Sequence, residues 1–431
     1  MSTDTRDRVL EPLTETSKWF YVLVGLLGIG VAWFVFAWVV QLRGGMIVTG
    51  LRDWGTMGGV PWGLYIGSFI WWIGIAHGGI MVSAAVRVFK VERLQPIARI
   101  AEIVTIVALP MAAANILFDL GRPDRVFNTI TQWPYTVHHS PLAWDVSVVM
   151  LYLALSMTYL IFSLRDEIYA LRDRLPGHLQ PIYGALLLGY RPGESAKVER
   201  MTWWLAVAIL AIVPLLSGGV VPWLFGLIAA QPGWYGAGTG PAMLVESLTS
   251  AFAIIVIVSA AFRYAYGWDD IIDDEVFRTL GVVLVFFTIA TLWFLLHDIL
   301  VGIYHAPVHI GALSETMIAM PLFWVAVGLI AAAHIFFVAQ SLGWMSFSLP
   351  GFVLASAGLA LAILVKKVLF VVEGLMYPTT GPLVNLYDTG AYVPSWVEIS
   401  VVLGTILTAA AMIVVITKVI PMVELHEEVE D

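Results

Sequence analysis

The sequence predicts an all-α membrane protein of about ten transmembrane helices, and three observations support this prediction. Hydrophobic residues make up 60 % of the 431 residues, whereas charged residues make up only 12 %. The mean hydropathy of +0.87 is typical of a polytopic membrane chain rather than of a soluble core. Apolar runs of about 20 residues or more recur along the chain, which is the length that an α-helix needs to cross a bilayer.

The apolar runs predict ten spans. They cover residues 20–41, 61–88, 97–118, 142–164, 203–228, 242–265, 279–302, 316–340, 350–376 and 396–420. The first run is too long for the core of a signal peptide, and no small-residue cleavage site follows it, so we count it as a span.

Lysine and arginine predict the orientation of these spans. An even number of spans places both termini on one side of the membrane. Most of the 22 lysines and arginines lie on that side, including those near residues 87–99 and 165–200. The positive-inside rule makes this side cytoplasmic. We therefore predict a multi-pass protein of the plasma membrane with both termini in the cytoplasm.

Composition also limits the chemistry of the chain. The chain contains no cysteine, so it provides no thiolate for an iron–sulfur cluster, a disulfide or a covalently attached haem. Much of the net charge of -9 comes from two acidic segments, 268–275 and 424–431. No basic stripe indicates nucleic acid as a partner. The lipid bilayer is the expected surrounding, and a redox centre of these kinds must belong to another subunit.

Two short matches predict an internal repeat. MVSAAVR at the end of the second span matches VIVSAAFR at the end of the sixth, which aligns Arg87 with Arg263. NILFDLG matches FLLHDIL farther on, which aligns Asp119 with Asp298. The spans concerned run in the same direction, so the sequence predicts two four-helix bundles in parallel repeat with two peripheral helices. Chance similarity between apolar segments remains the alternative.

The repeat divides the chain into four parts. The N-terminal segment and the first peripheral helix take residues 1–60, and the first four-helix bundle takes residues 61–228. The second four-helix bundle takes residues 229–376. The last peripheral helix and an acidic cytoplasmic tail take residues 377–431.

Three segments carry a resemblance to a known family. PWGLYIGSFIWWIGIAHGG in the second span, RLQPIAR before the third and DLGRPDR after it resemble membrane subunits of the polysulfide reductase type (NrfD/PsrC). The ten-span layout and YVPSWVEISVVLGTI at the last span are similar to the ten-helix quinone-interacting subunits of alternative complex III. The resemblance implies a haem-free subunit with a quinone site near the extracytoplasmic face of the first bundle. It also implies an iron–sulfur partner on that face, together with a molybdopterin-type or multihaem subunit.

The first bundle offers polar groups for such a site. A quinone headgroup needs polar contacts, an apolar cleft and a group that exchanges protons. We predict Asp119, Asp145 and His77 as proton-exchanging residues, and these three together with Tyr65 and Arg122 as residues that bind menaquinone or ubiquinone. Ionisable residues within spans are functional candidates because their burial is costly.

Each of these residues also has a structural interpretation. Asp119 and Arg122 lie in FDLGRPDRVF (118–127), which also suits a helix end with paired charges. Asp145 suits the start of a helix, His77 suits a hydrogen bond between helices, and Tyr65 suits an interfacial belt. Both interpretations stay open at this point.

The second bundle contains a further set of polar groups within its spans, which we treat as candidates for a proton path. They are Glu246, His297, Asp298, His334, Lys366 and Glu373. Lys366 and Glu373 are seven positions apart and share one helix face, whereas the adjacent Lys367 does not share it. A charge relay and a static ion pair fit this spacing equally well.

The function predicted from these patterns is that of a quinone-interacting integral membrane subunit in a respiratory oxidoreductase complex. Proton movement is a further possibility. The histidines are scattered singly, which disfavours a di-haem cytochrome b. An ion or solute transporter and a passive membrane anchor are the alternatives, and no motif for a metal site is present.

Overall fold

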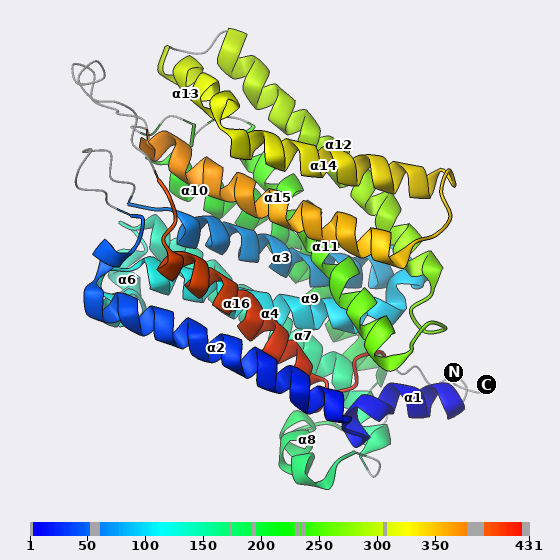
Figure 1. The fold of residues 1–431 in the computed structure, drawn as a ribbon. Helices are drawn as coiled ribbons and strands as arrows, with labels where there is room; N and C mark the ends of the chain where they lie inside the picture. Colours follow the sequence, from blue (N-terminus) through cyan, green and yellow to red (C-terminus); the bar gives the residue numbers. More distant parts are fainter. Residues whose placement is uncertain are drawn as a thin grey trace.

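The computed structural model describes residues 3–51, 61–172, 175–191, 195–228, 238–304, 308–376 and 392–424, together with residues 231, 233, 234 and 236. Within these residues the secondary structure is helical, without strands, and ten helices are long and apolar enough to cross a membrane. The predicted all-α fold class with ten spans is therefore confirmed (Figure 1).

Nine of the spans are single α-helices. They are α2 (Lys18–Gly44), α3 (Leu64–Arg87), α4 (Gln95–Asp119), α7 (Pro141–Leu171), α11 (Thr239–Tyr266), α12 (Asp274–Tyr304), α14 (Pro321–Ser341), α15 (Leu349–Met376) and α16 (Trp396–Ile416). The remaining span is the fifth in chain order. It consists of α9 (Ser195–Leu215), a π-helical turn η5 (Leu216–Val220) and α10 (Val221–Gly226).

Shorter helices lie before the first span and between the spans. They are α1 (Thr3–Thr14), η1 (Met46–Val48), η2 (Glu92–Leu94), η3 (Pro123–Arg125), α5 (Val126–Thr131), α6 (Trp133–Thr136), η4 (Gly177–Leu179), α8 (Gln180–Leu186) and α13 (Val308–Ala319). The predicted eighth span, 316–340, crosses a real break between α13 and α14. Met320 is extended, with φ -78° and ψ 120°, because a residue before proline is pushed out of the helical region.

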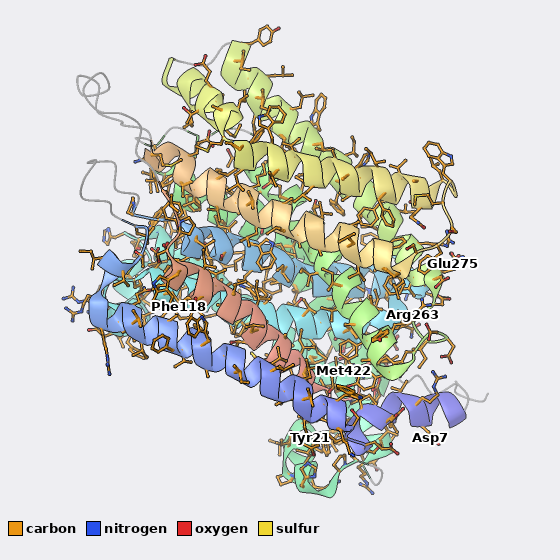
Figure 2. All side chains as sticks on the ribbon, in the orientation of Figure 1. Asp7, Tyr21, Phe118, Arg263, Glu275 and Met422 are labelled. Atoms are coloured by element: carbon orange, nitrogen blue, oxygen red, sulfur yellow. The ribbon has the colours of Figure 1, made fainter. Side chains whose placement is uncertain are left out.

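The spans define two ends of the molecule. We call the end that holds α1, α8 and the last described residue, Glu424, the terminal face, and the other end the opposite face (Figure 1). Figure 2 shows Asp7, Arg263 and Glu275 at the terminal face and Phe118 at the opposite face. Both ends of the described chain thus lie on one side, as an even number of spans requires.

Helix α3 forms the centre of the structure. Buried residues make up 83 % of its apolar stretch, compared with 11 % for α2. It packs against α4, α9, α11 and α15. Glycines permit this close packing, since a Cβ atom on Gly67 would lie 2.8 Å from the Val368 Cα atom, and one on Gly74 would lie 3.0 Å from the Ser247 Cα atom.

Contacts between successive spans connect each half of the chain. Helix α3 contacts α4, α4 contacts α7, and α7 contacts α9; in the second half α11 contacts α12, α12 contacts α14, and α14 contacts α15. Helices α2 and α16 pack against each other beside the first half. The predicted repeat and the four-part division of the chain stay predictions.

Candidate functional site

A hydrogen-bonded group joins three helices near the opposite face. The Tyr65 hydroxyl on α3 donates to Gln41 Oε1 on α2 at 2.6 Å, and Gln41 Nε2 donates to the Phe118 carbonyl on α4 at 2.7 Å. The Phe118 ring packs against Phe34, Trp38 and Tyr65 at centroid distances of 5.5, 5.2 and 6.2 Å. Tyr65 is fully buried, and its hydroxyl has a specific partner in Gln41.

Asp119 lies beside this group at the end of α4. Only 8 % of its surface is exposed, and its charge acts electrostatically on Tyr65. Asn115 lies one turn earlier on the same face of α4. Asn115 is fully buried, its Nδ2 donates to the Met111 carbonyl at 2.8 Å, and its Oδ1 has no partner among the described residues. The structure thus brings Tyr65 and Asp119 together and adds Gln41 and Asn115 to them.

Arg122 lies outside this buried group. Its guanidinium makes a two-point contact with the Asp124 carboxylate at 3.0 and 2.8 Å, and both side chains are more than half exposed. These hydrogen bonds from Arg122 lower the pKa of Asp124. The positions of Arg122 and Asp124 match the structural interpretation, in which paired charges follow a helix end.

His77 lies deeper than Tyr65 on α3. The two residues are twelve positions apart, which corresponds to about 18 Å along a helix. His77 is fully buried, its Nε2 is 2.5 Å from Ser217 Oγ, and its ring stacks on Tyr152 at 5.9 Å. Its Nδ1 has no hydrogen-bond partner within the described part of the chain.

Ser217 is a residue that sequence reasoning did not single out. It lies in the π-helical turn between Pro214 and Pro222. A proline inside a helix removes a backbone donor, and π-helical turns occur frequently at functional sites. The segment PLLSGGVVP carried this signal.

Asp145 is the fifth residue of α7 and is fully buried. Neither of its carboxylate oxygens has a hydrogen-bond partner among the residues that the structure describes. It therefore does not cap its helix through a side-chain hydrogen bond, and no hydrogen bond joins it to His77 or Asp119.

A third buried group, centred on Glu398, lies next to Tyr65, and it was not predicted from the sequence. Glu398 is fully buried and accepts hydrogen bonds from the Gly50 and Ser395 backbone N–H groups at 2.6 and 2.8 Å, and from the Tyr392 hydroxyl at 2.7 Å. Ser395 and Glu398 form a capping box at the start of α16. The S-x-x-E spacing is the sequence signal for this arrangement.

The second half contains a buried ion cluster. Glu246 on α11 accepts hydrogen bonds from Lys366 and from Lys367 on α15, the latter at 2.6 Å. Asp298 and Glu373 lie within electrostatic range of Lys366. The spacing predicted that Lys366, but not Lys367, shares a helix face with Glu373. Both lysines nevertheless reach Glu246 on the neighbouring helix α11, because long lysine side chains extend around their helix from adjacent positions.

The two histidines of this half lie apart from the contact between Glu246 and the lysines. His297 is next to Asp298 in sequence and acts electrostatically on it. His334 Nδ1 is 2.9 Å from Thr288 Oγ1. Because Thr288 is ten residues from Asp298 on α12, His334 lies about 15 Å along the helix from Asp298.

Comparison with known proteins identifies the family. The family described as polysulphide reductase, NrfD, matches residues 54–379, which is most of the chain. The chain belongs to the NrfD polysulphide reductase family. The resemblance predicted from the sequence is thereby confirmed, and ten apolar helices in an NrfD member indicate a multi-pass membrane protein.

Two curated relatives extend this comparison. A putative dimethyl sulfoxide reductase membrane subunit of Halobacterium salinarum is 29 % identical over 241 residues, which cover 56 % of this chain and 50 % of that protein. A selenate reductase subunit of Mesobacillus selenatarsenatis is 24 % identical over 437 residues, which cover 98 % of this chain and 96 % of that protein. The match therefore spans half the length of the first relative and nearly all of the second.

Proposed function

We propose that this NrfD chain is the quinone-interacting membrane subunit of a reductase complex, and that the headgroup site lies at the opposite face between α3 and α4. The observation that carries the proposal is the buried group formed by Tyr65 near the start of α3 and by Asn115 and Asp119 near the end of α4. The names of the two relatives, both of them reductase subunits, support a role in such a complex.

The residues at this site suit a quinone headgroup. A hydroxyl, two amides and a carboxyl are gathered beside the Phe118 ring and its aromatic neighbours. Asn115 Oδ1 is buried without a partner among the described residues, and such an atom is stabilised by a bound ligand or by water. When bound, a quinone supplies two-electron chemistry that takes up or releases two protons.

Each residue has a defined task in this proposal. Tyr65 and Asn115 orient the reduced headgroup, because its quinol hydroxyls can donate to the Tyr65 oxygen and to Asn115 Oδ1. Gln41 fixes the Tyr65 hydroxyl by accepting its proton at 2.6 Å. Asp119 accepts or donates protons at its carboxyl group. Asp145 and His77 are buried, with polar atoms that lack a partner in the described part of the chain, and they provide further places to hold a proton along the first half.

Photolabelling tests the location of the site without requiring turnover. In the complex purified from its native membrane, we expect a photoreactive azidoquinone to label peptides that contain residues 111–122 or 61–69, and excess natural quinone to suppress this labelling. Protected labelling confined to α11, α12 or α15 would place the site in the second half and contradict the proposal.

We also propose that the terminal face is cytoplasmic and that an iron–sulfur subunit, next to a molybdopterin-type or multihaem subunit, docks on the opposite face. The exposed Arg122–Asp124 pair and the short helices α5 and α6 lie on that face, beside the buried group of Tyr65 and Asp119. This arrangement places the partner's clusters close to the proposed quinone site.

Accessibility of the opposite face tests this orientation. A cysteine introduced at Asn128, in a chain that has none of its own, should react with a membrane-impermeant maleimide in intact cells. A cysteine at Lys90, on the terminal face, should react only after the membrane is opened. The reverse pattern would invert the orientation and remove the partner from the quinone side.

The ion cluster of the second half supports a proposal of coupled proton movement from the opposite face. Asp298 and Glu373 lie six and three residues from the opposite-face ends of α12 and α15, and Lys366 and Glu246 lie deeper. His297 adjoins the outer part of this set, whereas His334 lies about 15 Å farther in. The path we propose therefore runs inward from Asp298 and Glu373 to Lys366 and Glu246.

A further inference from the structure

A small buried cavity lies between α3, α4, α7 and α9, on the terminal side of His77. It is lined by Ile80, Glu102, Thr105, Ser156, Tyr159 and Ile209. The space suits about one water molecule, and although the lining is mainly apolar, Glu102, Thr105, Ser156 and Tyr159 offer polar atoms that such a water could contact. The cavity is separate from the proposed quinone site.

Among the described residues that line this cavity, Glu102 alone carries a carboxyl group. Just 5 % of its surface is exposed. Ser83 Oγ donates to Glu102 Oε1 at 2.6 Å, while Oε2 has no hydrogen-bond partner among the described residues. A buried carboxylate oxygen without a partner is costly, whereas a protonated carboxyl can donate to a water molecule in the cavity.

The cations near Glu102 are held by other carboxylates. Arg99 makes a two-point contact with Glu167 at 2.6 and 3.0 Å, and Arg87 donates to Glu424 at 2.7 Å. Arg87 also donates to the Tyr159 hydroxyl. The groups that face Glu102 are therefore Ser83 and Arg87 from α3, Arg99 from α4, Tyr159 from α7 and Glu424 from the C-terminal segment, while α9 contributes Ile209.

The C-terminal segment closes this region at the terminal face. Met422, Val423 and Glu424 are each less than 9 % exposed. The Tyr183 hydroxyl donates to the Val419 carbonyl at 2.9 Å, and Lys418 Nζ donates to the Pro12 carbonyl at 2.6 Å. The segment is thus held between α8 and α1, with Glu424 inserted between the two arginines.

Toward the opposite face, the cavity adjoins residues that surround His77. Thr105, a lining residue, donates to the Ala76 carbonyl at 2.6 Å, and the Tyr152 hydroxyl donates to the same carbonyl at 2.8 Å. Tyr152 stacks on His77. The hydrogen bonds of Thr105 and Tyr152 to the Ala76 carbonyl therefore lie between the Glu102 cavity and the His77 imidazole.

We infer that Glu102 is a proton-binding site that exchanges with the terminal side through water, and that Glu424 of the C-terminal segment keeps it protonated by pairing with Arg87 and by its own nearby negative charge. When Arg87 is released from Glu424, its nearest free carboxylate becomes Glu102, which then loses its proton and pairs with the arginine. This inference goes beyond the proposed quinone site, and its test does not depend on quinone turnover.

Dicyclohexylcarbodiimide reports on this site because it reacts with protonated carboxyl groups in apolar surroundings. The carboxyl proton passes to a reagent nitrogen, the carboxyl oxygen bonds to the central carbon, and the adduct rearranges to an acylurea without a leaving group. In the purified complex, we expect mass spectrometry to find the adduct on Glu102. Glu167, a largely buried carboxylate that is paired with Arg99, is the control and should remain unmodified.

Two variants test the role of Glu424. Glu424→Gln should lower labelling of Glu102 by about tenfold or more, since a cation brought close to a carboxyl favours its ionised form by at least that factor. Adding Arg87→Gln to this variant should restore the labelling, which simple loosening of the structure would not do. Absence of the Glu102 adduct in the native complex, or equal labelling in the native complex and in Glu424→Gln, would overturn the inference.

Discussion

Replacement of Asp119 by asparagine is expected to lower quinone-linked turnover by about 100-fold or more, the contribution that a positioned proton-transfer group makes. Asparagine keeps the shape of the side chain and its capacity for hydrogen bonds, but it cannot exchange the proton. Asp119 is 8 % exposed at the end of α4, so the substitution alters a buried group beside Tyr65. Turnover is measured with a soluble quinol analogue on the purified complex.

Asp124→Asn is the matched control for this prediction. Asp124 lies five residues farther along the same segment, is more than half exposed and pairs with Arg122. Exposed ion pairs contribute little to stability, and Asp124 lies outside the proposed site, so turnover should stay near the native rate. Any effect of this substitution should be on docking of the partner subunit. If the Asp119→Asn complex assembles and works at the native rate, the carboxyl takes no part in proton exchange and the segment is a helix end with paired charges.

Replacement of Glu246 by leucine is expected to cause the largest loss of stability. It leaves Lys366 and Lys367 buried without their common carboxylate, and removal of one partner from a buried ion pair costs about 3–5 kcal/mol. We expect a clear fall in the thermal unfolding midpoint and in the yield of folded protein in detergent. Intrinsic fluorescence of the 18 tryptophans provides the measurement.

Two further variants serve as controls for the Glu246→Leu result. Glu275→Gln removes a carboxylate that pairs with Arg93 and Arg278 near the surface and should leave the unfolding midpoint almost unchanged. A triple variant, Glu246→Leu with Lys366→Met and Lys367→Met, removes the whole ion cluster and should recover most of the lost stability. Native stability in the Glu246→Leu variant would mean that the two lysines do not depend on this carboxylate.

Much of the candidate site was predictable residue by residue, but its grouping was not. The sequence placed Tyr65, His77 and Asp145 within spans and Asp119 directly after one, and it marked these residues as costly to bury. It did not show that Tyr65 and Asp119 lie together while His77 lies deeper and Arg122 lies outside. These differences depend on helix rotation and depth, which apolar runs do not specify because most faces of a buried membrane helix are apolar.

The hydrogen-bond partners of these residues were even harder to predict from the sequence. Gln41 contacts Tyr65 from the preceding span, and Ser217 contacts His77 across 140 residues of sequence. Glu398 contacts the Tyr392 hydroxyl. Gln41 had no distinguishing local pattern. Ser217 and Glu398 had local signals in a proline-flanked Ser-Gly-Gly segment and a capping box, but neither pattern names the residue that it contacts.

By itself, the sequence determined the class of protein, the number of spans and the family, because the length of apolar runs and short linear motifs are local properties of the chain. Only the tertiary structure decided which charges meet. Glu246 reaches the two lysines across 120 and 121 residues, and Arg87 reaches Glu424 across 337 residues. In a membrane the cost of an unpaired buried charge makes such pairing strongly favoured, but many pairings satisfy that requirement, and only the packing of the helices around α3 selects one.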